Sequence, residues 1–291
     1  MFPSLAKYHR PAFIHSPLNY TGGKFKLLDK IIPLFPKNIG VFFDMFAGGL
    51  NVGVNVQCKH LVANDVCVPL IQLYRYLKQT EIPTILERIT ECRKAYNLSD
   101  RNADGYNALR EHYNGTPTDE RNPVELFCLV CHSFNHQIRF NSDGCFNMPF
   151  GKERSEYNDS IQSNLVKFCG ALQEKSTELW HRDYKDLTYD FLEPGDLLYA
   201  DPPYLISDAT YNMGWTAEDD RTLMRLFDDL DSRGISFALS NVLEHRGQRN
   251  EALCDWSSKY HVHRLAMDYS NCNYHSKNDD ENTCEVLVTN Y

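Results

Sequence analysis

The segment Leu197–Tyr204 constrains the fold more than any other part of this chain. An apolar run, Leu197–Ala200, is followed directly by Asp201, Pro202, Pro203 and Tyr204. A short apolar run bounded by turn residues is typical of a buried strand. The two prolines fix φ and carry no backbone N–H, so regular strand pairing cannot continue beyond Asp201. The sequence therefore predicts a buried strand whose carboxyl end carries an acidic, rigid and aromatic tip.

This tip carries the groups that could hold a flat base bearing an amino group. The Asp201 carboxylate and the Pro202 carbonyl can accept the two amino protons, and the Tyr204 ring can stack on the base. The constellation suggests methyl transfer to an exocyclic nitrogen of a nucleobase. The alternative for the isolated motif is a turn aspartate after a strand, with Tyr204 covering the core.

Further apolar runs predict the rest of a parallel sheet. Val41–Phe43 precedes Asp44, and Leu61–Ala63 precedes Asn64 and Asp65, with a helix expected over Leu50–Cys58. This βαβ pattern indicates an α/β fold. Other strands are expected over Leu197–Ala200, Ile235–Ser240 and Glu285–Thr289, and helices over Pro69–Gln79, Pro83–Tyr96, Val124–His132 and Asp219–Ser232.

A polar stretch interrupts this pattern. Residues 97–123 are rich in Asn, Asp, Gly and Thr, with a turn expected at Gly115–Pro117. Phe134–Gly151 is aromatic and contains Asn and Gly without a clean period, which indicates an ordered functional loop or hairpin. The sheet is therefore expected to be split by an insertion near residues 75–165.

Composition excludes few functions. The 291 residues carry a net charge of −9, so a nucleic-acid substrate would require a local basic face. No apolar stretch is long enough to span a membrane, and Met1–Pro17 has no continuous apolar run, so no membrane insertion and no secretory signal are expected. The ten irregularly spaced cysteines indicate reduced thiols of a cytoplasmic protein. We expect a monomer.

Two glycine turns near the N-terminus indicate a ligand site. Asp44–Gly49 lies where a strand turns into a helix, and Asp65 follows about 20 residues later, a spacing that suits ribose hydroxyls. The turn lacks the full G-x-G-x-x-G spacing, so a dinucleotide is not favoured. A second turn, Asn19–Lys24, ends in a cation that could neutralise a carboxylate or phosphate. A tight turn without ligand and an exposed lysine remain the alternatives.

Taken together, six ordered blocks make the chain resemble the Dam-type family of DNA adenine-N6 methyltransferases. The blocks are Asn19–Lys24, Asp44–Gly49, Asn64–Asp65, Arg139–Gly151, Asp201–Tyr204 and Glu285–Tyr291. The resemblance implies a Rossmann-like catalytic domain that binds S-adenosylmethionine, formed by residues 1–75 and 165–291. It also implies an inserted, mainly helical target-recognition domain over residues 76–164, with a DNA-binding hairpin.

The resemblance also implies residue roles in the catalytic domain. Asp201, Pro202, Pro203 and Tyr204 would hold an adenine flipped out of duplex DNA. Asp65 would bind the ribose of the cofactor. The other cofactor residues would be Tyr20 and Lys24 at the methionine end, Asp44, Phe46, Ala47, Gly48 and Gly49 in the pocket, Asp183 and Tyr184 at the adenine, and Asp201.

The recognition hairpin would read the DNA. Arg139 could donate a bidentate pair to guanine, and the resemblance suggests the site GATC. Phe134 and Asn135 would enter the base stack. Further DNA contacts would come from Gln137, where relatives are apolar, from Asn141 and Pro149, and from Lys152, where some relatives carry arginine.

Several alternatives remain open from the sequence. The acceptor could be a different amino group, such as N4 of cytosine, or the chain could be a DNA-binding protein that has lost catalysis. A methyltransferase acting on protein or RNA is a third class. Cys128 and Cys131 have C-x-x-C spacing, but the apolar run around them predicts buried thiols of a helix. His261 and His263 are interpreted as part of an exposed strand. No metal is therefore expected.

Overall fold

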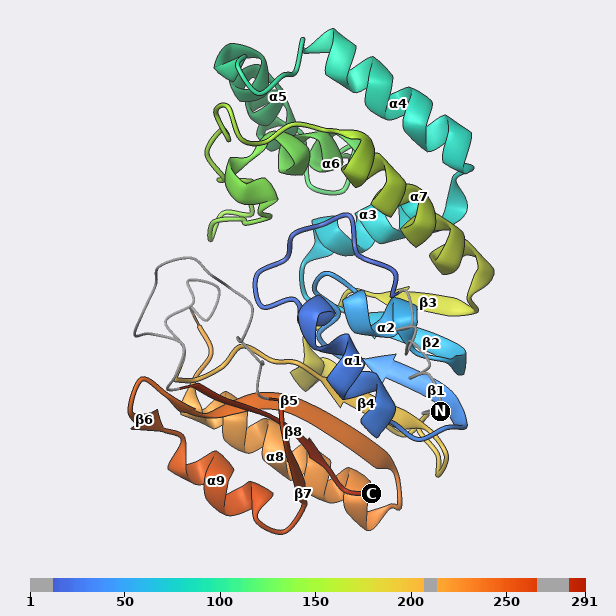
Figure 1. Cartoon of the computed structure of the whole chain (residues 1–291), viewed down its shortest axis with the longest axis vertical. Coiled ribbons are helices and arrows are strands. Elements are labelled where there is room, and N and C mark those ends of the chain that lie inside the picture. Colours follow the sequence, from blue (N-terminus) through green and yellow to red (C-terminus); the bar gives the residue numbers. More distant parts are fainter. Residues whose placement is uncertain (1–12, 207–213, 266–282) are drawn as a thin grey trace, which may run out of the picture.

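The computed structural model describes residues 13–206, 214–265 and 283–291. Of Met1–Pro17, residues 1–12 lie outside these ranges. The described residues form an eight-stranded sheet in the order β3-β2-β1-β4-β5-β8-β7, with β6 paired to β5 (Figure 1). The strands are β1 (Ile39–Asp44), β2 (Cys58–Asn64), β3 (Thr177–Trp180), β4 (Leu197–Ala200), β5 (Ser236–His245), β6 (Gln248–Arg249), β7 (His261–Arg264) and β8 (Thr283–Thr289).

The strand order creates a crevice in the middle of the sheet. Strands β1 to β5 pair in parallel, whereas β8 is antiparallel to both β5 and β7. Strands β2 and β3 lie on one side of β1, and the next strand in the chain, β4, lies on its other side. In such sheets ligands bind at the carboxyl ends of the strands, where the direction of winding changes. The mostly parallel sheet confirms the predicted α/β class.

Apolar residues cover both faces of the central strands, which is why these strands read as continuous apolar runs. Phe42 and Tyr199 belong to the hydrophobic cluster on one face, and their chain neighbours Phe43 and Leu198 to the cluster on the other. The second face is covered by α8 (Ala217–Ser232) and α9 (Glu251–Ser257). The first face is covered by η1 (Lys24–Leu27), α1 (Leu28–Ile31), η2 (Ile32–Leu34), α2 (Asn51–Asn55) and α3 (Val68–Gln79).

A helical region lies between β2 and β3 in the chain. After α3 it comprises α4 (Ile82–Ala95), α5 (Ala103–Gly115), α6 (Pro123–His132), η3 (Phe134–His136) and α7 (Asp159–Glu174). Its centre is α6, from which Val124 and every residue of Leu126–His132 are buried. Helices α4, α5 and α6 gather at one end of the molecule, away from the sheet (Figure 1). The division into two domains, with limits at 76 and 164, stays a prediction.

The elements differ from the sequence predictions where polar residues dominate. The stretch 97–123 contains α5, which begins where the Asn102 side chain accepts a hydrogen bond from Gly105 N at 3.1 Å. This helix buries Tyr106, Leu109 and Tyr113, a sparse but helical spacing. The helix expected over Leu50–Cys58 is shorter, because β2 already begins at Cys58. The sequence also missed η1, α1, η2, α7, β3, β6, α9 and η4 (Tyr184–Asp186).

Other expectations concern single residues. Cys128 and Cys131 are buried thiols of α6, as predicted, and the nine cysteines in the described ranges are all free; Cys272 lies outside them. His261 and His263 lie on β7 at the sheet edge. In the described part of the chain, no group of three or more side chains could hold a metal ion. No helix within the described ranges is long and apolar enough to cross a membrane.

Candidate active site

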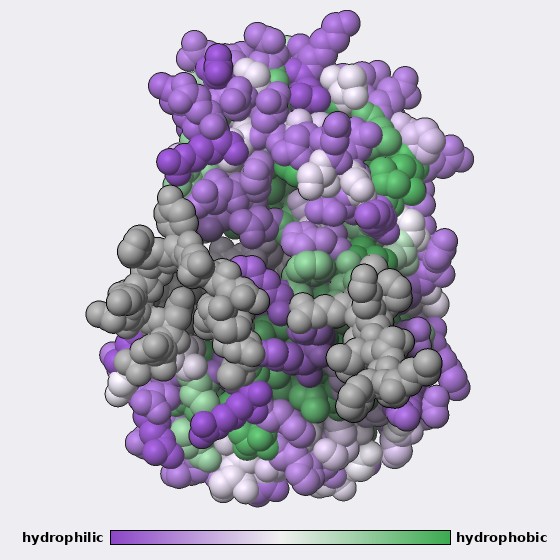
Figure 2. All heavy atoms as spheres, in the orientation of Figure 1, coloured by the Kyte–Doolittle hydropathy of each residue, from purple (hydrophilic) through white to green (hydrophobic). Residues whose placement is uncertain are grey.

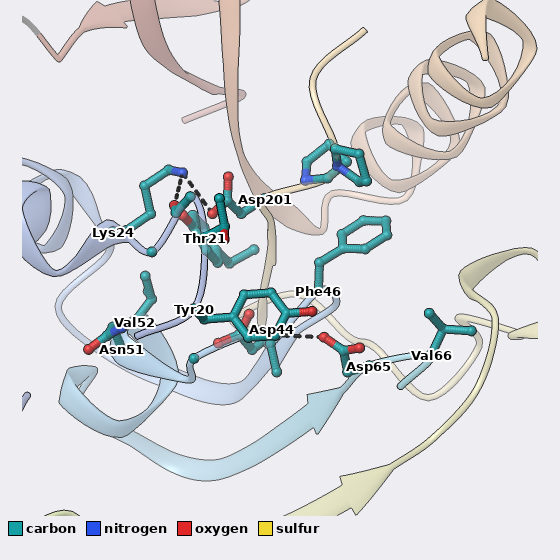
Figure 3. A pocket seen from close by; sticks show the side chains of 18 residues that line it. Tyr20, Thr21, Lys24, Asp44, Phe46, Asn51, Val52, Asp65, Val66 and Asp201 are labelled. Carbon is teal, nitrogen blue, oxygen red and sulfur yellow. Dashed lines mark hydrogen bonds and ion pairs between the residues drawn. The ribbon is translucent and has the colours of Figure 1, made fainter. Parts of the chain in front are cut away.

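Three carboxylates meet at the carboxyl ends of neighbouring strands. Asp44 ends β1, Asp65 follows β2, and Asp201 follows β4. All three line one cavity of about 200 Å³. The cavity is also lined by Tyr20, Lys24, Phe46, Ala47, Gly48, Gly49, Pro202 and Pro203, so the structure brings together most residues of the predicted catalytic and cofactor sets (Figure 3). Tyr204 is not among the residues that line this cavity.

Gly48 forms the floor of this cavity in a conformation that suits only glycine well. Its φ is +45°, and a Cβ there would lie 3.1 Å from the ring of Tyr20. Its N–H donates to Asp65 Oδ2 at 2.9 Å, and its carbonyl accepts from the Tyr74 hydroxyl at 2.6 Å. The loop is therefore held from both sides before any ligand binds.

Asp65 orders the turn after β2. Besides Gly48, it accepts a hydrogen bond from Cys67 N at 2.9 Å. Burial raises the pKa of Asp65, and the two backbone donors oppose that shift. A carboxylate oxygen has two lone pairs, so Asp65 keeps acceptor capacity for hydroxyl groups of a ligand.

Asp44 is the most deeply buried of the three carboxyl groups. Burial, together with the nearby charge of Asp201, raises the pKa of Asp44 to about 8. One of its oxygens accepts a hydrogen bond from Gly53 N at 3.2 Å. Asp44 is thus a largely neutral group at pH 7 that joins β1 to α2, while it also borders the cavity.

Asp201 lies in a cluster of charged and hydroxyl groups. Lys24, whose side chain is 5% exposed, places Nζ 2.8 Å from Asp201 Oδ2 and 3.5 Å from Glu285 Oε1. The Tyr204 hydroxyl lies 2.9 Å from Asp201 Oδ1 and 3.2 Å from Glu285 Oε1. Lys24 Nζ also lies 5.1 Å from the centroid of the Tyr204 ring. The cation predicted to neutralise an anion therefore pairs with the key carboxylate of the site.

A second cavity adjoins the first across Phe46. It is lined by Asp183 and Tyr184, which the resemblance assigned to an adenine, and it shares Phe46, Asp65 and Val66 with the first cavity. The ring of Tyr184 lies 5.4 Å from that of Phe46 and 5.5 Å from that of Trp215. Val66 is 69% exposed, as expected for an apolar side chain left at the rim of a ligand site.

Asn64 fixes these two cavities relative to each other. Its side-chain amide donates to the carbonyls of Met45 and Arg182 at 3.1 and 3.0 Å, and its oxygen accepts from Arg182 N at 3.0 Å. One buried amide therefore joins the ends of β1 and β2 to the segment after β3 that carries Asp183 and Tyr184.

The predicted DNA-binding residues lie on a separate hairpin after α6. Ser133 pairs with Phe150 and Phe140 pairs with Phe146, which confirms the expected ordered hairpin. Arg139 is exposed, and its Nε and Nη2 donate to Asn147 Oδ1 and Asn147 O at 2.9 and 3.3 Å. These contacts occupy one side of the guanidinium and leave its terminal edge, formed by both Nη atoms, for another partner.

The other hairpin residues are mostly exposed. Phe134 is 40% exposed, and Asn135 adopts a left-handed backbone with φ of +56°. Asn141 closes the tip by accepting hydrogen bonds from Asp143 N and Cys145 N. Pro149 and Lys152 are exposed, and Gln137 is half-buried.

The hairpin contacts the segment that leads into the first cavity. Asn19 donates to the carbonyl of Asn135 at 2.8 Å, and it forms a parallel bridge with Gln137. Because Tyr20 follows Asn19 and packs over Gly48, this contact links the exposed hairpin to the cavity floor.

Sequence reasoning missed three residues of these sites. Glu285 carried a signal, since it is a charged residue at the start of an otherwise apolar strand, but its contact with Tyr204 spans 81 positions. Trp215, which directly precedes the capping residue Thr216 of α8, was not assigned a role. Asn147 lies inside the quoted hairpin block but has no signal of its own.

Comparison with known proteins adds independent evidence. The family model for D12 class N6 adenine-specific DNA methyltransferases matches residues 20–271. The chain is 39% identical to the type II methyltransferase M.FokI of Planomicrobium okeanokoites, over 99% of this chain and 44% of that protein. It is 40% identical to the modification methylase StsI of Streptococcus sanguinis, over 96% of this chain and 43% of that protein.

A more distant relative is the DNA adenine methylase of Escherichia coli K12, 26% identical over 77% of this chain and 79% of that protein. The chain spans less than half the length of M.FokI and StsI. Methyltransferases of this kind use S-adenosylmethionine as methyl donor. The chain belongs to the family of D12 class N6 adenine-specific DNA methyltransferases.

Proposed function

We propose that this chain transfers a methyl group from S-adenosylmethionine to N6 of an adenine in duplex DNA. The observation that carries the proposal is the position of Asp201. This residue follows β4, where the strand order of the sheet changes direction, and it borders the same cavity as Asp65 and Gly48. One carboxylate can therefore contact an acceptor base while the others shape a cofactor site beside it.

The residues of the two cavities fit S-adenosylmethionine. Asp65 offers acceptors for ribose hydroxyls. Phe46, Trp215 and Val66 supply apolar surface for an adenine ring, with Asp183 and Tyr184 beside them. Tyr20 and Lys24 also line the first cavity, where Lys24 could pair with the carboxylate of the cofactor. The bound cofactor supplies an activated methyl group.

The tip after β4 would hold the target base. An adenine inside a duplex is stacked, so its amino group can reach Asp201 only after the base is flipped out. Asp201 and the Pro202 carbonyl would accept the two amino protons, which aims the nitrogen lone pair away from the ring plane. Pro203 keeps the tip rigid, and Tyr204 would stack on the base. These groups act by positioning and electrostatics.

The hairpin would read the sequence. Arg139, with its terminal edge directed away from Asn147, is suited to a bidentate contact with guanine O6 and N7. Phe134 and Asn135 would occupy the gap in the base stack, and Gln137, Asn141, Pro149 and Lys152 would contact nearby bases or phosphates. GATC is the first site to test. Because the chain is more similar to modification methylases than to the E. coli adenine methylase, another adenine site is the alternative.

We further propose that residues 76–164 act as the recognition domain, and that the protein works as a monomer. The names of its relatives suggest a role in modifying DNA against a restriction enzyme. This role rests on those names alone, because the chain spans less than half of those proteins.

Methyl incorporation from labelled S-adenosylmethionine would test the proposal. Duplexes that differ only in the presence of GATC serve as substrates, and the product nucleosides are separated after digestion. N6-methyladenine confined to the GATC duplex supports both the reaction and the site. N6-methyladenine elsewhere keeps the reaction and rejects the site, whereas N4-methylcytosine or no methylated nucleoside rejects the reaction.

A further inference from the structure

Glu285 is a half-buried carboxyl group that the proposed reaction does not use. It lies near the start of β8, and its side chain is 23% exposed. Its Oε1 lies 3.2 Å from the Tyr204 hydroxyl and 3.5 Å from Lys24 Nζ. Burial raises the pKa of Glu285, and Lys24 opposes that shift. A half-buried acid beside the key carboxylate suits a proton-handling role.

The hydrogen-bond geometry leaves a place for one more proton. The Tyr204 oxygen lies within hydrogen-bond distance of both Asp201 and Glu285, but a phenol has a single proton to donate. When both carboxyl groups are ionised, only one of them can receive it. With one added proton, both contacts are satisfied, since the protonated carboxyl donates to the phenol and the phenol donates to the other carboxylate.

The reaction produces such a proton. After methyl transfer, N6 carries the new methyl group and two hydrogens, and one of these hydrogens must leave as a proton. We propose that this proton passes from N6 to Asp201 and, through the Tyr204 hydroxyl, to Glu285. This inference rests on the proposed function, because it requires that Asp201 holds the amino group.

The step conserves protons and charge. The N6–H bond breaks as Asp201 gains a proton, Asp201 Oδ1 passes a proton to Tyr204 Oη, and the original Oη proton moves to Glu285 Oε1. Asp201 returns to its ionised form, Tyr204 is unchanged, and Glu285 ends neutral. Its partial exposure lets Glu285 release the proton to solvent. Lys24, whose Nζ lies 3.5 Å from Glu285 Oε1, favours the ionised form of Glu285 before the next turnover.

Steady-state methyl transfer by Glu285→Gln, Tyr204→Phe and the double variant tests the relay, because the proton leaves after the methyl group has been transferred and must be cleared before the next turnover. The glutamine can still accept from Tyr204 but cannot take a proton, and the phenylalanine keeps the ring while it removes the hydroxyl. On a duplex that the wild-type protein methylates, each single variant should lose at least about 100-fold in rate. The double variant should lose no more than the slower single variant, because both changes break one path.

Binding measurements separate the relay from a structural role. Cofactor and DNA dissociation constants of both variants should stay within about twofold of wild type, and exposed Glu244→Gln on β5 should keep the wild-type rate. A wild-type rate in Glu285→Gln, losses that multiply in the double variant, or a parallel loss of binding would overturn the relay. If Glu285→Gln does not fold, a wild-type rate in Tyr204→Phe overturns it alone.

The relay and the proposed function fail in different ways. Methylation that survives Asp201→Ala rejects the proposed function itself. An inactive Asp201→Ala together with a fully active Glu285→Gln rejects only the relay.

Discussion

The two cavities at the sheet and the hairpin after α6 differ in how exposed their side chains are and in how many partners hold them. At the sheet, Asp44, Asp65 and Lys24 are buried and engaged by backbone or charged partners before any ligand binds. On the hairpin, Phe134 and Arg139 project into solvent, and Arg139 has described hydrogen bonds only to Asn147. On the face shown in Figure 2, the helical end is mostly hydrophilic, with scattered hydrophobic residues.

This difference indicates a division of labour. Buried, preorganised groups can stabilise a reaction because they need little rearrangement during it. Exposed groups on a loop can follow the shape and sequence of a large partner. Changes in the cavities should therefore alter cofactor binding or rate on every DNA sequence, whereas changes in the hairpin should alter the dependence on sequence.

The largest of these effects is expected for Asp65→Asn. The variant removes the charge that would accept ribose hydroxyls and that holds Gly48 and Cys67. A hydrogen bond to a charged group contributes about 1.5–3 kcal/mol, so cofactor affinity should fall about 10- to 150-fold. Calorimetric titration with S-adenosylmethionine measures this loss, with exposed Asp190→Asn as control. An unchanged cofactor affinity would remove Asp65 from the site.

Arg139→Ala should change sequence preference rather than chemistry. Loss of a bidentate contact with guanine costs about 1–3 kcal/mol of discrimination, so the ratio of kcat/KM between cognate and substituted duplexes should fall by roughly 5- to 150-fold. The rate at saturating DNA should change far less. The control is Arg154→Ala, which replaces an exposed arginine outside the hairpin. Equal losses on all sequences would reduce Arg139 to a phosphate contact.

The variant Asp44→Asn tests the burial of the cavity residues through the pH dependence of folding stability. Because burial raises the pKa of Asp44 to about 8, the folded protein keeps a proton that the unfolded chain loses near pH 4. The folded state then binds more protons, so this group makes the protein less stable as pH rises from 4 to 8. The amide that replaces the carboxyl group in the variant cannot titrate, so the variant lacks this dependence.

The free energy of unfolding of the variant, relative to wild type, should therefore increase between pH 5 and pH 8 by on the order of 3–4 kcal/mol. Denaturant unfolding without cofactor measures it. Exposed Asp119→Asn should show no such trend. A difference that shrinks with rising pH would mean that Asp44 is ionised in the folded protein.

The smallest effect is expected for Asn147→Ala. The variant removes the side-chain acceptor of Arg139 Nε but leaves the backbone acceptor in place. A neutral acceptor of this kind contributes about 0.5–1.5 kcal/mol, so the discrimination between cognate and substituted duplexes should fall by about two- to tenfold. In a protein that already carries Arg139→Ala, the added Asn147→Ala should cause no further loss. Losses that add in the double variant would show that Asn147 acts independently of Arg139.

The sequence predicted the centre of the site because strand ends are locally encoded. Asp44, Asp65 and Asp201 each follow an apolar run, and parallel strands bring such ends to one edge. The depth of burial of Asp44, and hence its raised pKa, had no signal in the sequence. The edge strand β3 also had no clear signal in the sequence, because half of its residues are polar.

The partners of these residues could not be predicted, since they depend on tertiary contacts. Glu285 reaches Tyr204 only because β8 inserts between β5 and β7. Trp215 meets Phe46 and Tyr184 across segments that lie far apart in the chain. Asn147 was visible within the hairpin, but its contact with Arg139 depends on how the two arms pair.

The most direct test of the account compares wild type with Asp201→Ala in two measurements on one duplex. Single-turnover methyl transfer should fall at least about 100-fold, because the carboxylate that positions the amino group is lost. The dissociation constant for the duplex, which the proposed hairpin contacts would set, should stay within about twofold. Near-normal methylation by Asp201→Ala would contradict the account, and so would a loss of rate that only follows a loss of DNA binding.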